Sequence, residues 1–350
     1  MSRASEMMKY VGSMQQAAYI RPFTYAEGRS AGMKAWEVKN GPLSYKILAD
    51  KCLDVGELSY RGVNFSFLSK PGLQGRNPYD TAGPEAIRSI MGGMFFTCGV
   101  ESICAPCNVD GVDYPMHGRM RTTPAEHLGA DAYWAEDGYH LTARGEMREA
   151  ALFGENMVLR RSIDTVYGEK TVTVTDVFQN QGYRDEPLML LYHINLGWPF
   201  LDENLRLYLP TRRVTPRDAE AEGHEGEYDR MDPPKDNEPE YVFIHDLKVD
   251  ADGDTCAIAV NEALGLGFAI RWNTRYLPCF MEWKSTASGD YVIGLEPANS
   301  SVYGRPYHEE RGTVHRLPPF ASETNVLTFT VLDGQAEIDA ALAAFRKTFG

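Results

Sequence analysis

Residues 171–178 read TVTVTDVF, and this stretch indicates the fold class more directly than any other part of the chain. Threonine and valine are β-branched residues that favour strands, and their alternation places the valines on one face. The same strand character recurs in EYVFIHDLKV (240–249), CAIAVNE (256–262), GFAIRWN (267–273) and NVLTFTVLD (325–333). Because such short runs are separated by Gly, Pro, Asn and Asp, we expect an all-β protein.

Turn and helix signals complete the secondary-structure prediction. The glycine-containing segment ALGLG (263–267) predicts a hairpin between two of these strands. Helical periodicity is scarce, but AEIDAALAAFRKTF (336–349) places Ile338, Leu342 and Phe345 at i, i+4 and i+7. That spacing predicts a C-terminal helix packed on the outside of the β body. The segment TAGPEAIRSI (81–90) is consistent with a short helix that starts near Pro84.

The bulk composition is that of one folded unit. The chain has 350 residues, of which 43% are hydrophobic and 24% charged, and this mixture provides enough apolar surface for a large core. The length alone allows two domains, but all-β units often exceed about 200 residues. No repeat or linker divides the sequence. We therefore expect a single domain over residues 1–350.

Charge and cysteine content limit the partners and the compartment. The formal net charge is −14 with a pI of about 5.1, and no basic stripe is present, so neither nucleic acid nor an anionic membrane is an expected partner. Residues 1–16 lack a signal-peptide stretch, and no apolar window reaches the length of a membrane span. The six cysteines are scattered along the chain, at Cys52, Cys98, Cys104, Cys107, Cys256 and Cys279. Because scattered cysteines fit a reducing compartment, we expect a cytoplasmic protein.

Residues 217–240 depart from the rest of the chain in composition. The segment RDAEAEGHEGEYDRMDPPKDNEPE is acidic, contains prolines and has almost no large apolar residues. It predicts a long, weakly packed surface loop between strands. Two interpretations stay open, a solvated connection or a lid over a site.

Motifs of the common cofactor-dependent enzymes are missing. CAPC (104–107) has neither the strand-to-helix context of a redox CxxC nor a second ligand pair for zinc. GxGxxG, GxxxxGK[ST], GxSxG and HExxH do not occur. The sequence therefore favours acid/base chemistry with no metal and no organic cofactor.

Three segments combine an ionisable residue with surroundings that should hold it rigidly. They are YPMHGRMRTTPAEH, which contains His117 and Arg119, MLLYHINLGWPFLDE, which contains His193 and Asn195, and FMEWKSTASGDYVIGLEPANS, which ends its apolar run at Glu296. Buried ionisable groups are costly unless they are paired. Each residue alone fits a structural role equally well, a histidine bonded to backbone or a buried ion pair.

Six motifs, taken in order, resemble a known family. GSMQQ (12–16), DKCLDVG (50–56), GGMFFTCG (92–99), HGR (117–119), YHINLGWP (192–199) and GLEP (294–297) resemble aldose 1-epimerase-like proteins of the galactose mutarotase superfamily, specifically a bacterial branch of unassigned substrate. The resemblance covers nearly the whole chain. It implies a large antiparallel β-sandwich of the supersandwich type, with the active site in a cleft on one sheet and no metal or cofactor.

The resemblance also implies roles for individual residues. His193 would be the general acid, Glu296 the general base and His117 a sugar ligand. Arg119 is our first candidate for a substrate-binding arginine and Arg88 the second. Asn195 is a further expected substrate contact, and Trp283 and Trp198 are candidate platforms for a sugar ring.

The expected function is aldose 1-epimerase (mutarotase) activity on a small sugar. A carboxylate and an imidazole can remove one proton and deliver another near neutral pH, as ring opening requires. The same pair also suits a sugar isomerase, epimerase or lyase that moves a proton on carbon. A carbohydrate-binding protein without catalysis is the remaining alternative.

Overall fold

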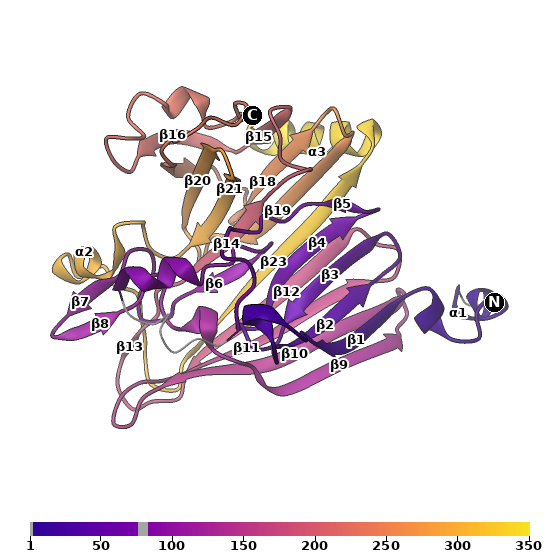
Figure 1. Cartoon of the computed structure of the whole chain (residues 1–350), viewed down its shortest axis with the longest axis horizontal. Coiled ribbons are helices and arrows are strands. Elements are labelled where there is room, and N and C mark those ends of the chain that lie inside the picture. Colours follow the sequence, from indigo (N-terminus) through magenta and orange to yellow (C-terminus); the bar gives the residue numbers. More distant parts are fainter. Residues whose placement is uncertain (1–2, 76–82) are drawn as a thin grey trace.

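Antiparallel sheets make up most of the structure (Figure 1). The computed structural model describes residues 3–75 and 83–350. The largest sheet has eight strands in the spatial order β15, β18, β19, β23, β12, β11, β10, β9. In that order their bounds are Leu205–Tyr208, Asp254–Asn261, Leu266–Asn273, Ser322–Asp333, Thr171–Asn180, Asn156–Val166, Tyr139–Ala150 and Glu126–Trp134.

Two further sheets pack against this one. A six-stranded sheet has the order β16, β17, β20, β21, β14, β6, with bounds Thr211–Pro216, Tyr241–Leu247, Cys279–Ala287, Asp290–Ala298, Leu191–Leu196 and Phe96–Cys98. A five-stranded sheet runs β1 to β5, with bounds Tyr19–Thr24, Lys34–Lys39, Leu43–Leu48, Asp54–Tyr60 and Val63–Asn64. Isolated bridges pair Val55 with Phe95 and Ser66 with Leu196, and so connect these two sheets.

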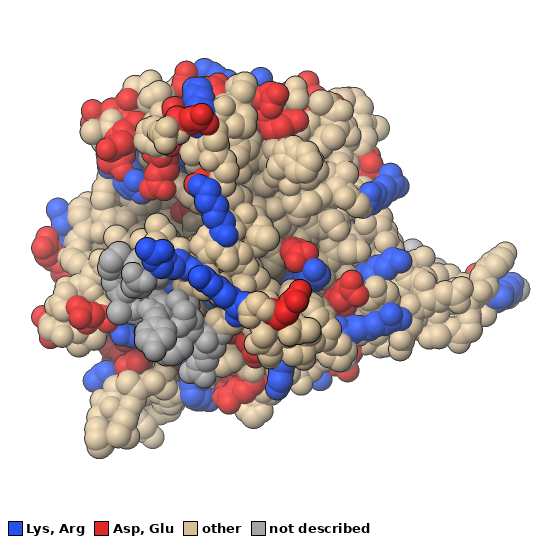
Figure 2. Space-filling model, in the orientation of Figure 1, with Lys and Arg blue, Asp and Glu red and all other residues tan. Residues whose placement is uncertain are grey.

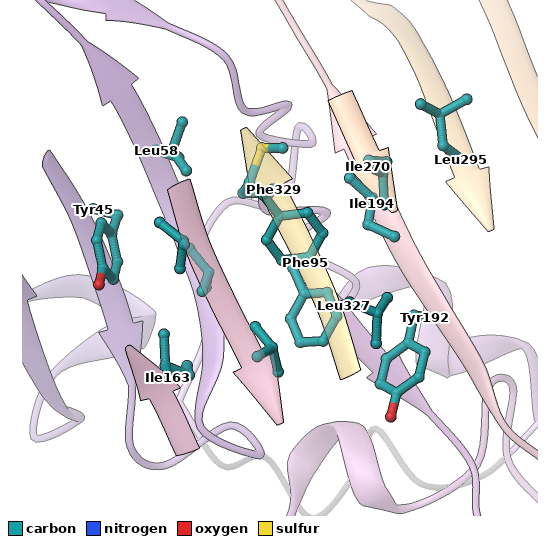
Figure 3. Close-up of a cluster of buried hydrophobic side chains, with 14 of the residues drawn as sticks. Tyr45, Leu58, Phe95, Ile163, Tyr192, Ile194, Ile270, Leu295, Leu327 and Phe329 are labelled. Carbon is teal, nitrogen blue, oxygen red and sulfur yellow. The ribbon is translucent and has the colours of Figure 1, made fainter. Parts of the chain in front are cut away.

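The main core fills the space between the eight-stranded sheet and the other two. Strand β12 alternates strictly between buried and half-buried positions, as its valines and threonines predict. Figure 3 shows the large side chains that meet in this core. They come from all three sheets and include Tyr45, Leu58, Ile163, Phe329, Tyr192 and Leu295. The predicted all-β sandwich is confirmed.

Helices and small hairpins lie outside this core. The C-terminal helix α3 (Gln335–Phe349) buries Ile338 and Leu342 against Ile258 of β18, on the outer face of the eight-stranded sheet. The predicted packing of this helix is therefore confirmed. Within residues 3–75 and 83–350 the remaining elements are α1 (Arg3–Met7), α2 (Gly304–Glu310), five 3-10 turns at Met14–Gln16, Gly28–Ser30, Gly83–Arg88, Met120–Thr122 and Glu225–Glu227, and the strand pairs β7 (Cys107–Val109) with β8 (Val112–Tyr114) and β13 (Glu186–Pro187) with β22 (Arg316–Leu317).

Several smaller expectations can be compared with the structure. The hairpin at 263–267 is present between β18 and β19, and the 3-10 turn Gly83–Arg88 lies where a short helix was expected. All six cysteines are free thiols. No helix in the described ranges is long and apolar enough to cross a membrane.

The acidic segment 217–240 is a loop, as predicted, but it is not weakly packed. Ala221 is fully buried and Met231 is 3% exposed. Ala221 packs with Tyr241 and Phe243 of β17, and Met231 joins the main core. A few well-placed apolar side chains therefore anchor a segment whose average composition is strongly polar.

A buried ionic network ties the three sheets together. The Arg161 guanidinium of β11 forms a bidentate pair with Asp176 of β12, at 2.7 and 2.6 Å, and donates to Asp54 of β4 at 2.6 Å. It also donates to the hydroxyl of Thr97 in β6, and the hydroxyl of Tyr192 in β14 donates to Asp176. The Arg161 side chain is completely buried. Burial still raises the pKa of Asp54 to about 6, although Arg161 opposes this effect.

We expect Arg161→Met to lower the free energy of unfolding by roughly 3–5 kcal/mol, because it leaves two buried carboxylates without their counter-charge. Urea denaturation at neutral pH measures this loss. The neighbouring Arg160 is a matched control, because its side chain is 48% exposed and pairs with Glu146 at the surface. Arg160→Met should cost less than about 1 kcal/mol. Equal losses in the two variants would contradict the importance of the network.

Candidate active site

Strand β14 carries the histidine around which the site is built. The strand lies between β21 and β6, and all six of its residues are buried. Because side chains alternate along a strand, His193 and Asn195 share one face while Tyr192 and Ile194 point into the core. The site therefore lies on the face of the six-stranded sheet that points away from the eight-stranded sheet.

Glu296 of β21 contacts His193 directly. Its Oε1 lies 3.1 Å from Nε2 of His193, and the two side chains are only 6% and 8% exposed. A Cβ atom on Gly294 would lie 3.0 Å from both Glu296 Oε1 and His193 Cε1, and 3.2 Å from Cε3 of Trp283. These three side chains therefore converge over the bare backbone of Gly294.

His117 reaches the same place from the loop that follows β8. Its ring centroid lies 5.6 Å from that of His193, and both rings contact Phe96, which stacks on His193 at 4.6 Å. The Nδ1 atom of His117 is buried and has no hydrogen-bond partner among the described residues. A buried nitrogen of this kind is available to a polar ligand. The structure thus brings together the three residues expected to act on and bind a sugar.

Burial controls the protonation of the pair. Burial raises the pKa of Glu296 to about 8; the Glu240 carboxylate raises it further, and the Arg217 guanidinium opposes the rise. Burial lowers the pKa of His193 to about 4, while the amide of Asn195 opposes this. Burial also lowers the pKa of His117. Near neutral pH the pair therefore holds one proton, and the neutral forms of both groups are favoured.

Trp283 of β20 forms one wall of the site. Its ring meets the His193 ring edge-on at 5.4 Å and the Phe67 ring at 6.3 Å. The indole Nε1–H donates to Oε2 of Glu240 at 2.8 Å. The other oxygen of Glu240 accepts from Nη2 of Arg217 at 3.2 Å. Glu240 and Arg217 are site residues that the sequence did not suggest, because they look like ordinary charged positions in a polar loop.

Asn195 and Arg119 are engaged with protein groups. The Asn195 amide donates to the backbone oxygens of Gly93 and His193, so its contacts orient the strand that carries His193. Arg119 pairs with Glu101 and donates to the carbonyl of Asp113, and the structure does not bring it to the His193–Glu296 pair. The cation beside Glu296 is Arg217.

Two weaker candidates from the sequence lie at exposed positions. Arg88 ends the 3-10 turn Gly83–Arg88, and Trp198, two residues beyond β14, is 74% exposed. Trp198 is not among the aromatic rings that contact His193 in the described part of the chain.

One group of side chains has the spacing of metal ligands, on a different sheet. Ligand atoms of Glu126, His127 and Glu146 lie within 4.8 Å of one another at the edge formed by β9 and β10. Arg148 and Arg160 already bond the two oxygens of Glu146. Because these cations supply positive charge, the group fits a surface ion-pair network better than a metal centre.

Comparison with solved structures defines the class of fold. The chain matches a candidate aldose 1-epimerase from Klebsiella pneumoniae with a TM-score of 0.89 at 24% identity, covering 99% of this chain and 91% of that one. It also matches a galactose mutarotase-like protein from Clostridium acetobutylicum (TM-score 0.63, 15% identity, 91% and 99% covered) and a galactose 1-epimerase from Lactobacillus acidophilus (0.56, 13%, 91% and 100%). The fold is that of the galactose mutarotase-like proteins.

Sequence comparison places the chain in a particular family. Residues 30–331 match DUF4432, a domain of unknown function. The protein belongs to this family. No curated protein matches the chain.

We expect Glu296→Gln to stabilise the protein at alkaline pH. The folded protein keeps the Glu296 proton up to about pH 8, whereas an unperturbed glutamate ionises near 4.5. Unfolding therefore releases a proton in this range, and wild-type stability falls as pH rises, by up to about 1.4 kcal/mol per pH unit. Glutamine removes this loss. Urea unfolding of both proteins at pH 5 and pH 8 measures the difference.

The gain should be larger at pH 8 than at pH 5. Glu262, an exposed residue of the β18–β19 hairpin, supplies the control, since Glu262→Gln removes a carboxylate that water already solvates. An equal effect of Glu296→Gln at both pH values would show that Glu296 is ionised in the folded protein throughout this range.

Proposed function

We propose that the protein is an aldose 1-epimerase that interconverts the anomers of a sugar, with His193 and Glu296 as its proton-transfer pair. The observation that carries the proposal is the 3.1 Å contact between His193 Nε2 and Glu296 Oε1 on the outer face of the six-stranded sheet. Isomerase activity of this type also agrees with the names of two proteins that share the fold, the candidate aldose 1-epimerase and the galactose 1-epimerase.

Anomer exchange requires two proton movements. The C1 hydroxyl must lose a proton while the ring oxygen gains one, so that the C1–O bond of the ring breaks and a free aldehyde forms. After rotation about C1–C2, the reverse transfers close the ring on the other face. The protein begins and ends the cycle with the same number of protons, so the pair acts as a catalyst without any redox partner.

The single proton of the pair suits this cycle. Without substrate, burial favours a neutral Glu296 carboxyl in contact with a neutral His193. Transfer of the proton along that contact produces a Glu296 carboxylate and a His193 imidazolium. We propose that the carboxylate accepts the C1 hydroxyl proton and that the imidazolium donates to the ring oxygen. His117, whose buried Nδ1 lacks a partner, would bind a sugar oxygen, and Trp283 would supply an apolar wall.

We expect Glu296→Gln and His193→Asn each to lower kcat on the order of 10²-fold or more, because each removes a positioned proton-transfer group. Polarimetry of freshly dissolved α-glucose and α-galactose measures the rate. KM should change less than kcat, since the lost interactions form chiefly in the transition state.

A second His–Glu pair serves as the control. His315 Nε2 lies 2.6 Å from Glu323 Oε1 beside β22 and β23, and Glu323→Gln should leave kcat near its wild-type value. NMR in deuterated water tests the rival reactions, because proton transfer at carbon would introduce deuterium at that carbon. Near wild-type turnover in Glu296→Gln would overturn the proposal.

The pH dependence of kcat/KM should be bell-shaped. Below about pH 4 the pair gains a second proton on His193, and above about pH 8 it loses its only proton from Glu296. Either change removes one of the two roles, although the apparent values belong to the pair as a unit. Initial rates between pH 3.5 and pH 9.5, a range that extends roughly half a unit below the lower limit and roughly one and a half units above the upper limit, give the profile. A rate that keeps rising above pH 9 would exclude the protonated carboxyl from the active form.

A further inference from the structure

Loop 217–240 concentrates the negative charge of the protein. It contains ten carboxylates and three basic residues, and so contributes half of the formal net charge of −14. In Figure 2 acidic side chains gather at the upper left, where Figure 1 places β16 and the loop that follows it. The last residue of the loop, Glu240, reaches the proton-transfer site by accepting a hydrogen bond from the indole N–H of Trp283.

The two ends of the loop meet at the rim of the site. Strands β16 and β17 pair antiparallel, and just beyond β16 the Arg217 N–H donates to the carbonyl of Val242 in β17. Arg217 and Glu240 are consequently brought face to face, and their side chains form an ion pair of 3.2 Å. Arg217 also pairs with Asp218.

Glu240 links this ion pair to the buried histidine. One of its oxygens holds Arg217 and the other accepts the indole N–H of Trp283 at 2.8 Å. The register places Trp283 opposite Val242, two residues beyond Glu240 in the chain. The same indole contacts the His193 ring edge-on at 5.4 Å. The chain of contacts thus runs from Arg217 through Glu240 and Trp283 to His193.

Arg217 and Glu240 also act on Glu296 by charge, in opposite directions. Glu240 raises the pKa of Glu296 and Arg217 lowers it, while Glu282, on the other face of the sheet, raises it less. His193 is the ionisable group in direct contact, and the thiols of Cys98 and Cys104 lie close enough for their pKa values to respond to Glu296.

We propose that Arg217 and Glu240 are positioning residues for the His193–Glu296 pair, holding Trp283 against the imidazole and setting, by opposing charges, when the pair holds its proton. The consequence for catalysis rests on the proposed function, whereas the effect on the titration of Glu296 does not. It gives loop 217–240 a definite task, since the loop supplies both charges and keeps them in contact.

The test is a direct titration of Glu296 in the protein without substrate. Carbon-13-labelled glutamate carboxyls are followed by NMR, and the signal absent from Glu296→Gln identifies the residue. Glu240→Gln should lower the titration midpoint and Arg217→Gln should raise it, each by roughly half a pH unit or more. The double variant should return toward the wild-type midpoint. Glu220→Gln, at an exposed position of the same loop, should leave the midpoint unchanged.

Opposite shifts separate an electrostatic role from simple damage to the site, because damage would move both variants in the same direction. Unchanged midpoints in both single variants, or shifts of one sign, would overturn the inference. The alkaline limb of kcat/KM should follow the same two directions. If the midpoints move as expected but no sugar anomerises, the positioning role stands and the proposed function fails.

Discussion

The contact on which the rest of the structure depends is the burial of Arg161 between Asp54 and Asp176. Its three groups belong to the five-stranded and eight-stranded sheets, and Thr97 and Tyr192 connect them to the six-stranded sheet. An ion pair without solvent is tolerated only when every charge finds partners in exact geometry. Its formation therefore fixes how the sheets are placed, in a way that non-directional apolar packing does not. Thr97 pairs with Tyr192 across the sheet, and Phe96 and His193 form the adjacent pair. The network therefore also fixes the position of the site.

Ionisable groups are buried in different ways on the two faces of strand β14. On the core side, the Tyr192 hydroxyl joins a network in which the Arg161 guanidinium lies in direct contact with two carboxylates. On the outer side, burial pushes His193 and Glu296 each toward its neutral form, and Arg217 opposes this only in part for Glu296. The first arrangement stabilises the fold. The second makes a proton easy to move, at a cost in stability that enzymes commonly accept at their active sites.

Much of the architecture could be predicted because strand periodicity is a local property. The alternation in TVTVTDVF and the spacing of Ile338, Leu342 and Phe345 each indicate which face of the strand or helix is buried. The sequence also contains an overlooked signal for Arg161, which falls in phase with Leu159 and Ile163, two buried residues of the same strand, whereas Arg160 falls out of phase. Arg217 and Glu240 have no comparable signal. They become site residues only because a hairpin brings the ends of a polar loop together, and the same dependence on tertiary contacts explains why Arg119 pairs with Glu101 instead.

Gly294 has no side chain to take part in chemistry, yet it lies in a confined space. The space that a methyl group would occupy at this position is bordered by atoms of Glu296, His193 and Trp283. Reach across a sheet is limited by strand spacing of about 4.8 Å, and a longer side chain at this position would force its neighbours apart rather than add a function. The absence of a side chain at Gly294 therefore leaves room for the 3.1 Å contact between His193 Nε2 and Glu296 Oε1. A search for active-site residues that scores side chains by their reactivity would pass over this position, although a single added carbon there would lie 3.0 Å from atoms of both Glu296 and His193 and would require a neighbour to shift.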